Sequence, residues 1–192
     1  MNKSQLNVIR LRLNLSKKGH DLLDKKVFIL SKEISDLKQK RDLLKKNISE
    51  TLDIALQSII NANIEIGLNR VQSLSQQIPH IQIEILQGSI MGTEVSLINY
   101  KDTNDSTEND KIENKTLKFT VSKYNDIKNL CLLLAMLEDS IQKLNHTFKK
   151  TEIRVNALKN IVIPKQEAQL KMLLEIQEEQ EREVIGRLNS FR

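Results

Sequence analysis

Residues 6–55 read LNVIRLRLNLSKKGHDLLDKKVFILSKEISDLKQKRDLLKKNISETLDIA, and one stripe of positions in this segment recurs at alternating intervals of three and four. Eleven of the fifteen positions are apolar, and the spacing runs unbroken over seven heptads. A repeat of this length is typical of a coiled-coil helix. The stripe consists of Leu6, Ile9, Leu13, Ser16, His20, Leu23, Val27, Leu30, Ile34, Leu37, Arg41, Leu44, Ile48, Thr51 and Ala55, and it continues as Ile59, Ala62 and Ile66.

The same spacing returns in the second half of the chain. Its phase shifts through Gln166 and then resumes from Leu170. Pro164 lies beside this shift, and a proline within a helix lacks an N–H and clashes with the carbonyl four residues earlier. We therefore expect a kink near Pro164, with the helix continuing because the apolar period resumes. The second stripe consists of Ile127, Leu130, Leu134, Leu137, Ile141, Leu144, Phe148, Thr151, Val155, Leu158 and Val162, then Leu170, Leu173, Gln177, Gln180 and Val184.

Between the two stripes the period changes. Pro79 is expected to end the first helix, and residues 81–85 (IQIEI) alternate with a period of two. Residues 95–98 and 117–121 also resemble strands, because apolar and β-branched residues dominate them. Gly88 and Gly92 are expected to bracket the turn between the first two strands. Residues 101–116 are acidic and nearly free of apolar residues, which predicts a flexible, solvated loop.

Together these patterns predict a mainly α fold: a long antiparallel two-helix left-handed coiled coil with a small insert at its turn that contains a β-hairpin. The first helix is assigned to residues 1–78, the insert to 79–121 and the second helix to 122–192. If arms of nearly equal length fold back on one another, the numbers of facing residues add up to about 198. The two ends of the chain would then meet at one blunt end, with His20 opposite Glu178.

Composition supports few, long elements. Among 192 residues there are 5 glycines, 2 prolines and no tryptophan, too few for a fold with many turns. The single cysteine excludes a disulfide scaffold. The longest apolar run, residues 130–137, is far shorter than the roughly 20 residues that span a bilayer, so we expect no insertion into the membrane. No apolar segment of a signal peptide is present, which predicts a cytoplasmic protein.

No catalytic motif is found. The three histidines are far apart in the sequence, and there is no phosphate-binding glycine motif and no triad of a nucleophile with its base. We therefore expect no enzyme activity, no cofactor and no metal. Residues 1–50 carry 13 Lys and Arg against 6 Asp and Glu, but no aromatic residues alternate with them to stack on bases. Nucleic acid is accordingly not an expected partner.

Two groups of apolar residues fall outside the stripes. A two-helix seam does not bury them, so either the insert or a second protein must cover them. The first group is Leu52, Ile54, Leu56 and Ile60, and the second is Leu132, Leu133 and Met136.

Three segments resemble the D subunits, the central rotor shafts, of V-type and archaeal-type (V/A) rotary ATPases. Residues 154–164 (RVNALKNIVIP) are similar to the family's RVNALE-x-x-x-IP segment, here formed by Arg154, Val155, Asn156, Ala157, Leu158, Ile163 and Pro164. Residues 19–26 (GHDLLDKK) are similar to its GHxLLKxK segment, and residues 181–188 to its closing charged segment. The family's Pro-Thr-Arg opening is absent, Lys159 replaces a common acid, and Asn189 replaces a usual lysine.

The resemblance implies a shaft inside a hexamer of alternating A and B subunits, where ATP hydrolysis or synthesis occurs at A–B interfaces and not on this chain. It implies three further contacts: a small stalk subunit, named F, on the side of the shaft, a connector subunit (d or C) at the turn end, and through it the membrane rotor ring that transports H+ or Na+. The complex would lie on the cytoplasmic face of the membrane. We expect the apolar residues outside the stripes to bind F. The tip inside the head is assigned to Leu6, Ile9, Leu13, Gly19, His20, Val184, Arg187 and Leu188.

Two other functions remain open from the residues alone. A prefoldin-like chaperone arm also runs helix, β-hairpins, helix, and a coiled-coil scaffold needs only the two stripes. A chaperone is expected to assemble with itself and leave its tips free, whereas a shaft is expected to accompany a nucleotide-binding head.

Overall fold

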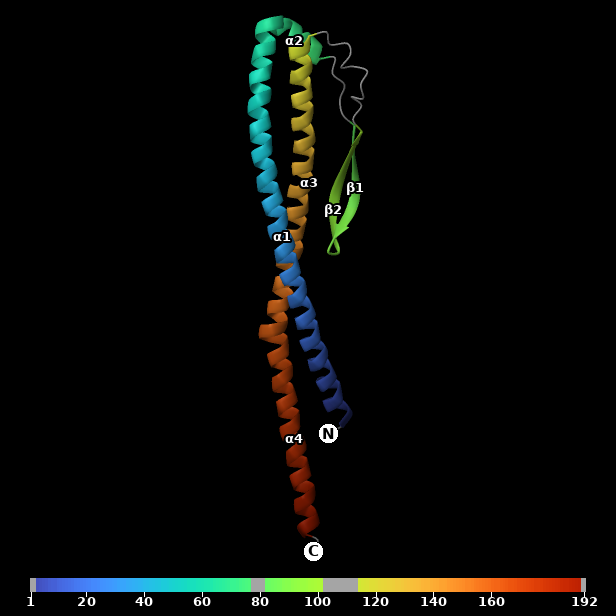
Figure 1. Cartoon of the computed structure of the whole chain (residues 1–192). Coiled ribbons are helices and arrows are strands. Elements are labelled where there is room, and N and C mark those ends of the chain that lie inside the picture. The colour runs from blue at the N-terminus through green and yellow to red at the C-terminus, as the bar shows by residue number, and fades with distance from the viewer. Residues whose placement is uncertain (1–2, 77–81, 102–113, 191–192) are drawn as a thin grey trace. The chain divides into compact units, whose positions relative to one another are not determined.

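The computed structural model describes residues 3–76, 82–101 and 114–190 (Figure 1). The chain divides into two compact units. Unit 1 contains Met1–Ser31 and His146–Arg192, and unit 2 contains Lys32–Asn145. The elements in chain order are α1 (Lys3–Ile66), α2 (Leu68–Ser75), β1 (Gln82–Ile90), β2 (Thr93–Lys101), α3 (Lys115–Ala157), the π-helical turn η2 (Leu158–Val162) and α4 (Ile163–Ser190).

The predicted mainly α fold is confirmed: long paired helices and a small antiparallel hairpin between them in the sequence. Every position of the first stripe, from Leu6 to Ile66, is buried or half-buried. The second stripe is likewise buried or half-buried from Ile127 to Gln177. It fails at its end, because Gln180 and Val184 are exposed. The heptad spacing therefore identified the packed face of each helix except in the last turns of α4.

Buried hydroxyl groups in the helices are satisfied locally. Ser58 donates to the carbonyl of Ala55 at 2.8 Å, and Thr151 donates to the carbonyl of Thr147 at 2.7 Å. Ser140 and Thr120 donate in the same way to carbonyls four residues earlier. Because these bonds stay within one helix, small polar residues enter the seam without leaving a buried donor unpaired.

The register of the helix pair differs from the expectation. In unit 1, Lys17 pairs with Glu167 at 2.7 Å, so the two numbers add up to 184. In unit 2, Lys45 pairs with Glu138 at 2.8 Å, and the numbers add up to 183. The expected sum was about 198 because the arms were taken to reach residue 76 and to restart at residue 122. The paired helices instead end at Ile66 and restart at Lys115, which shifts the register.

Gly67 ends α1 earlier than expected. Its φ of 89° and ψ of 143° lie outside the helical region, in a conformation that L-residues other than glycine rarely adopt. The helical hydrogen bonds continue on both sides, from the Gly67 N–H to the Asn63 carbonyl and from the Val71 N–H to the Gly67 carbonyl. The chain therefore changes direction at Gly67, and Pro79 lies outside the described residues.

The hairpin is longer than the two predicted strands. Its register pairs Ile85 with Ile98 and closes with Ile90 opposite Thr93. The turn residues Met91 and Gly92 both have positive φ, 53° and 75°, as a two-residue type I′ turn requires. Gly88 lies within β1, opposite Val95, and does not bracket the turn as expected.

The strand expected at residues 117–121 is wrong. These residues belong to the first turns of α3, which begins at Lys115. Leu117 and Thr120 are buried at a spacing of three, as on one face of a helix, so tertiary packing overrides the β-branched composition. Of the acidic loop expected at 101–116, residues 102–113 lie outside the described part of the chain.

The helix continues past Pro164, as expected. Directly before it, the Ile163 N–H donates to the carbonyl of Leu158, five residues earlier, so the turn at η2 is wider than an α-helical turn. Pro164 has no N–H to donate to Asn160, and the wide turn moves the backbone out of the α-helical register at that point. The expected kink takes the form of a π-helical turn, and a bend of the helix axis stays a prediction.

Candidate functional surfaces

The described residues contain no group that would form a reaction centre. No three His, Cys, Asp or Glu side chains among them are placed to hold a metal ion. Across residues 3–76, 82–101 and 114–190, none of the helices has a stretch sufficiently long and apolar to cross a membrane. The candidate surfaces are therefore surfaces for binding other proteins.

The motif residues of 154–164 lie in unit 1, across the end of α3, the turn η2 and the start of α4. Val155 is buried, and Ala157, Leu158 and Ile163 are half-buried. Arg154, Asn156 and Pro164 are exposed. The motif thus alternates residues that pack against α1 with residues that face outward, and it contains the one π-helical turn of the described chain.

His20 lies at the level of Pro164, not opposite Glu178 as expected, because Lys17 pairs with Glu167 three residues away on each helix. Its Nδ1 lies 3.3 Å from Asp21 Oδ1, whereas its Nε2 is buried and has no partner in the described part of the chain. The buried Oε1 of Gln166 also has no partner there. These two side chains form a polar layer in a seam that is otherwise apolar.

The residues assigned to the tip are not brought to one blunt end. Leu6 is buried, and Ile9, Leu13 and Gly19 are half-buried against the partner helix of unit 1. The register places Lys3 at the level of Glu181, so α4 continues for roughly nine residues, about 14 Å, past the start of α1. Val184, 57% exposed, and Arg187 lie on this extension with all of residues 181–187 exposed. Leu188 belongs to α4, but its side chain lies outside the described residues.

Sequence reasoning missed a second apolar stripe on α1, which we name the outer stripe: Val8, Leu11, Leu15 and Leu22. All four side chains are exposed, and the first three line a shallow hollow of about 380 Å³ together with Arg12, Asn14 and Lys18. The spacing of three, four and seven residues was visible in the sequence. It was overlooked because it runs two positions behind the longer stripe that the seam uses.

The apolar residues expected to bind F lie in unit 2. Leu52, Ile54, Leu56 and Ile60 are exposed on α1, so the described hairpin does not cover them. On α3, Leu133 is exposed, whereas Leu132 and Met136 are half-buried. Because Lys45 pairs with Glu138, Leu52 lies at about the level of Leu132, and the two groups are neighbours along the helix pair.

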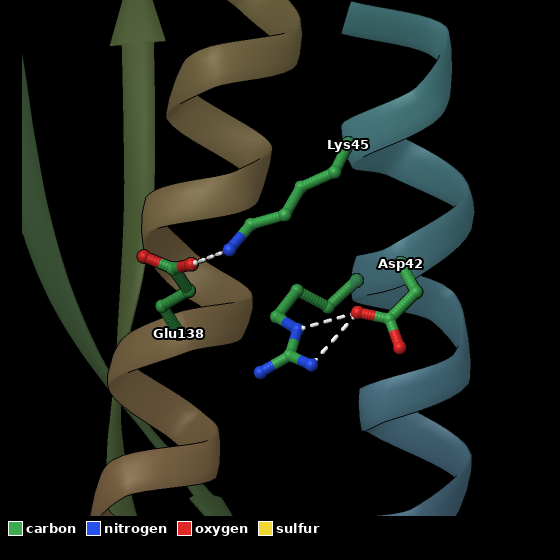
Figure 2. Close-up of polar contacts among 4 residues, drawn as sticks. Asp42, Lys45 and Glu138 are labelled. Atoms are coloured by element: carbon green, nitrogen blue, oxygen red, sulfur yellow. Dashed lines mark hydrogen bonds and ion pairs between the residues drawn. The ribbon is translucent and has the colours of Figure 1, made fainter.

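Charged contacts flank this apolar surface (Figure 2). Lys45 Nζ lies 2.8 Å from Glu138 Oε1 across the two helices, and both side chains are half-exposed. The hydrogen bond from Lys45 is the largest cause that holds the pKa of Glu138 below its ordinary value, and the Lys45 and Arg41 charges add to it. Arg41 itself donates from Nε and Nη2 to Asp42 Oδ1, at 2.9 and 2.7 Å.

Comparison with known proteins gives a consistent result. The family model for the ATP synthase D subunit matches residues 5–192. The chain is 28% identical over 192 residues to the V-type ATP synthase D subunit of Thermotoga neapolitana, covering 99% of this chain and 95% of that protein. It is 27% identical over 191 residues to the A-type ATP synthase D subunit of Pyrococcus horikoshii, covering 97% and 89%. It is 28% identical to the A-type ATP synthase D subunit of Thermococcus gammatolerans, with the same coverage of 97% and 89%.

Proposed function

Because this chain belongs to the family of ATP synthase D subunits, we propose that it is the central rotor shaft of a V/A-type ATPase and performs no catalysis of its own. The observation that carries the proposal is the match over residues 5–192, which includes both halves of the helix pair and the hairpin between them. A shaft couples ATP hydrolysis or synthesis in a head of A and B subunits to a membrane ring that transports H+ or Na+. The assembled complex would be peripheral, on the cytoplasmic face of the membrane.

The tip in unit 1 supports this role because its two helices present different surfaces. The extension of α4 carries exposed Val184 and Arg187, and α1 carries the outer stripe. An asymmetric shaft inside a ring of three A–B pairs contacts each pair differently. Those differential contacts bias each catalytic site toward a different state, which is the requirement for coupling rotation to the reaction.

The exposed apolar surface of unit 2 supports a second contact, with F, the small stalk subunit. Leu52, Ile54, Leu56 and Ile60 provide a row of exposed aliphatic side chains, with Leu133 nearby on α3. An exposed apolar group rimmed by charged residues such as Lys45 and Glu138 is typical of a protein–protein interface. The connector subunit would bind at the turn end, around α2.

Truncation tests the orientation of the shaft. Removal of the first and last two heptads should abolish rotation-coupled ATP hydrolysis in the reconstituted complex, because the tip contacts inside the head are lost. Binding of F should persist, since its surface lies in unit 2. Coupled hydrolysis that survives the truncation would contradict the assignment of this end to the head.

Substitution tests the contact with F. Ile54→Asp combined with Ile60→Asp should weaken F binding by at least about 100-fold, because two apolar anchors are lost and two charges are desolvated. Leu43→Asp is the matched control, because Leu43 is an equally exposed aliphatic residue on α1 outside the group. Equal loss in both variants would show that charge on α1, not this surface, controls binding.

A pull-down separates the shaft from the chaperone alternative. A tag inserted near Asn109 should recover two large nucleotide-binding subunits in excess over this chain, together with ATPase activity. A self-assembled oligomer with unfolded polypeptides and no ATPase activity would refute the shaft.

A further inference from the structure

The hairpin of unit 2 is held on α3 by a compact polar cluster. The Ser96 backbone N–H in β2 donates to Asp139 Oδ2 at 3.2 Å, and Lys143 Nζ donates to Ser96 Oγ at 2.7 Å. Lys143 and Asp139 form an ion pair at 2.7 Å, one helical turn apart. The lateral edge of β2 is therefore bound to a helix, and its N–H at Ser96 has a charged partner.

Asp139 is committed to this cluster as an anion. Hydrogen bonding from Lys143 is the largest cause that lowers the pKa of Asp139. Partial burial opposes the shift, and the Ser96 hydroxyl and backbone N–H both reinforce it. Three donors from two elements thus converge on one carboxylate, and two of them belong to the hairpin.

Apolar contacts of the hairpin are few. Val95, 2% exposed, and Thr93 are buried, but the large side chains of β1 remain in solvent: Ile83, Ile85, 69% exposed, and Leu86. Leu97 of β2 is also exposed. A two-stranded hairpin is at best marginally stable alone, so its position depends on what holds it to the helix. Here a small apolar contact and one polar cluster do so.

We propose that Ser96, Asp139 and Lys143 form a polar latch that holds the hairpin reversibly on α3, so that the hairpin docks and undocks as a unit. The latch residues 139 and 143 lie on one face of α3 with Leu132 and Met136, because the spacing is four, three and four. Both apolar residues are half-buried, whereas Leu133, which lies off this face, is exposed. Undocking uncovers this face for a partner.

Distance measurements on the full chain test the latch directly. Cys131 is the single cysteine and is exposed on α3, and Ser89→Cys adds a second exposed site on β1. Spin labels at these two positions should give one narrow distance distribution. Asp139→Ala should broaden it and raise the undocked population roughly tenfold, because a charge-assisted bond and an ion pair are lost together.

Glu138→Ala is the matched control, because it removes the adjacent carboxylate and an interhelical ion pair of nearly equal length without touching the hairpin. Its distribution should stay narrow. Ser96→Ala is a milder second variant that keeps the backbone donor, and it should shift the population in the same direction by a smaller factor. An unchanged distribution in folded Asp139→Ala, or equal broadening in Glu138→Ala, would overturn the latch.

A binding measurement tests the consequence, and this part rests on the proposed function. Asp139→Ala should bind F more tightly than the unaltered chain, and Glu138→Ala should not. An undocked hairpin with unchanged F affinity would overturn the role of the latch in covering this face. Absence of F binding to every chain, unaltered included, would count against the proposed function and leave the latch intact.

Discussion

Two residues interrupt the helices of this protein, and the backbone responds differently at each. At Gly67 the backbone takes φ 89° and ψ 143°, so α1 ends and α2 begins with a new direction. At Pro164 the helix continues, and the irregularity moves to the preceding residues as the π-helical turn η2. One interruption ends a helix and the other only widens it.

The difference follows from what each residue changes. Proline keeps φ near the helical value and removes one donor, so a helix that repositions its neighbouring hydrogen bonds can retain it. Glycine removes no donor, but it alone makes a positive φ accessible without steric strain. Glycine therefore permits a change of direction where proline permits a local adjustment.

Gly67→Ala is expected to have the largest effect. A Cβ at this position meets no atom within 4 Å, so the effect reports the positive φ alone. The free energy of unfolding should fall by about 1–2 kcal/mol, as measured by chemical denaturation.

Gly186→Ala is its control. Gly186 lies inside α4 with equally open space around a Cβ, so alanine should raise helix stability by about 1 kcal/mol or less. Opposite signs for the two substitutions support the comparison. A stabilised Gly67→Ala protein would show instead that α1 extends through this position.

Pro164→Ala is expected to have a smaller effect of opposite sign. It restores an N–H that can reach the Asn160 carbonyl, which should raise the free energy of unfolding by about 1 kcal/mol. The gain stays below the roughly 3 kcal/mol of an unrelieved helical proline because η2 already accommodates the ring. Lys165→Ala, at the exposed neighbouring position, should change little, and a destabilised Pro164→Ala protein would mean that packing favours the wide turn.

His20→Leu tests the polar layer at the level of Pro164. Leucine removes a buried Nε2 that has no partner in the described part of the chain. The free energy of unfolding should rise by about 0.5–1 kcal/mol, near the low end for such a group because a fifth of the side chain remains exposed. Asp24→Ala, exposed one turn away, serves as the control. A destabilised His20→Leu protein would show that His20 has a structural hydrogen-bond partner.

The smallest expected effect is the pH dependence of the Lys45–Glu138 pair, which sets the register of unit 2 on the side of Gly67. The pKa of Glu138 lies below its ordinary value of 4.5, with Lys45 and Arg41 of α1 as the charges that face it. A lowered carboxyl pKa contributes stability that is present above the ordinary pKa and is lost as pH falls through the folded value.

The stability difference between the unaltered chain and Glu138→Gln should therefore be present at about pH 6 and shrink toward about pH 3. A double-mutant cycle with Lys45→Met isolates the pair at each pH. A difference that grows as pH falls would contradict the direction of the shift.

Local pattern was sufficient for the seam, because the spacing of three and four states which face of a helix is apolar. The same reasoning failed at residues 117–121, where β-branched residues lie in α3, and at Gly88, which pairs within β1. In both places tertiary packing decides between local conformations of similar energy. The candidate surfaces were partly predictable: the apolar residues of 52–60 were found from the sequence, whereas the outer stripe was overlooked.

The sequence by itself determined the two long helices, the face that each buries, the hairpin between them and the family, because these depend on periodicity and on short motifs. Only the tertiary structure decided the register, the break at Gly67, the extension of α4 and the contact of Ser96 with Asp139 and Lys143. Register is a long-range property: a heptad repeat pairs almost equally well after a shift of seven residues. The ends of the paired helices and the few charged contacts between them select one of these alignments.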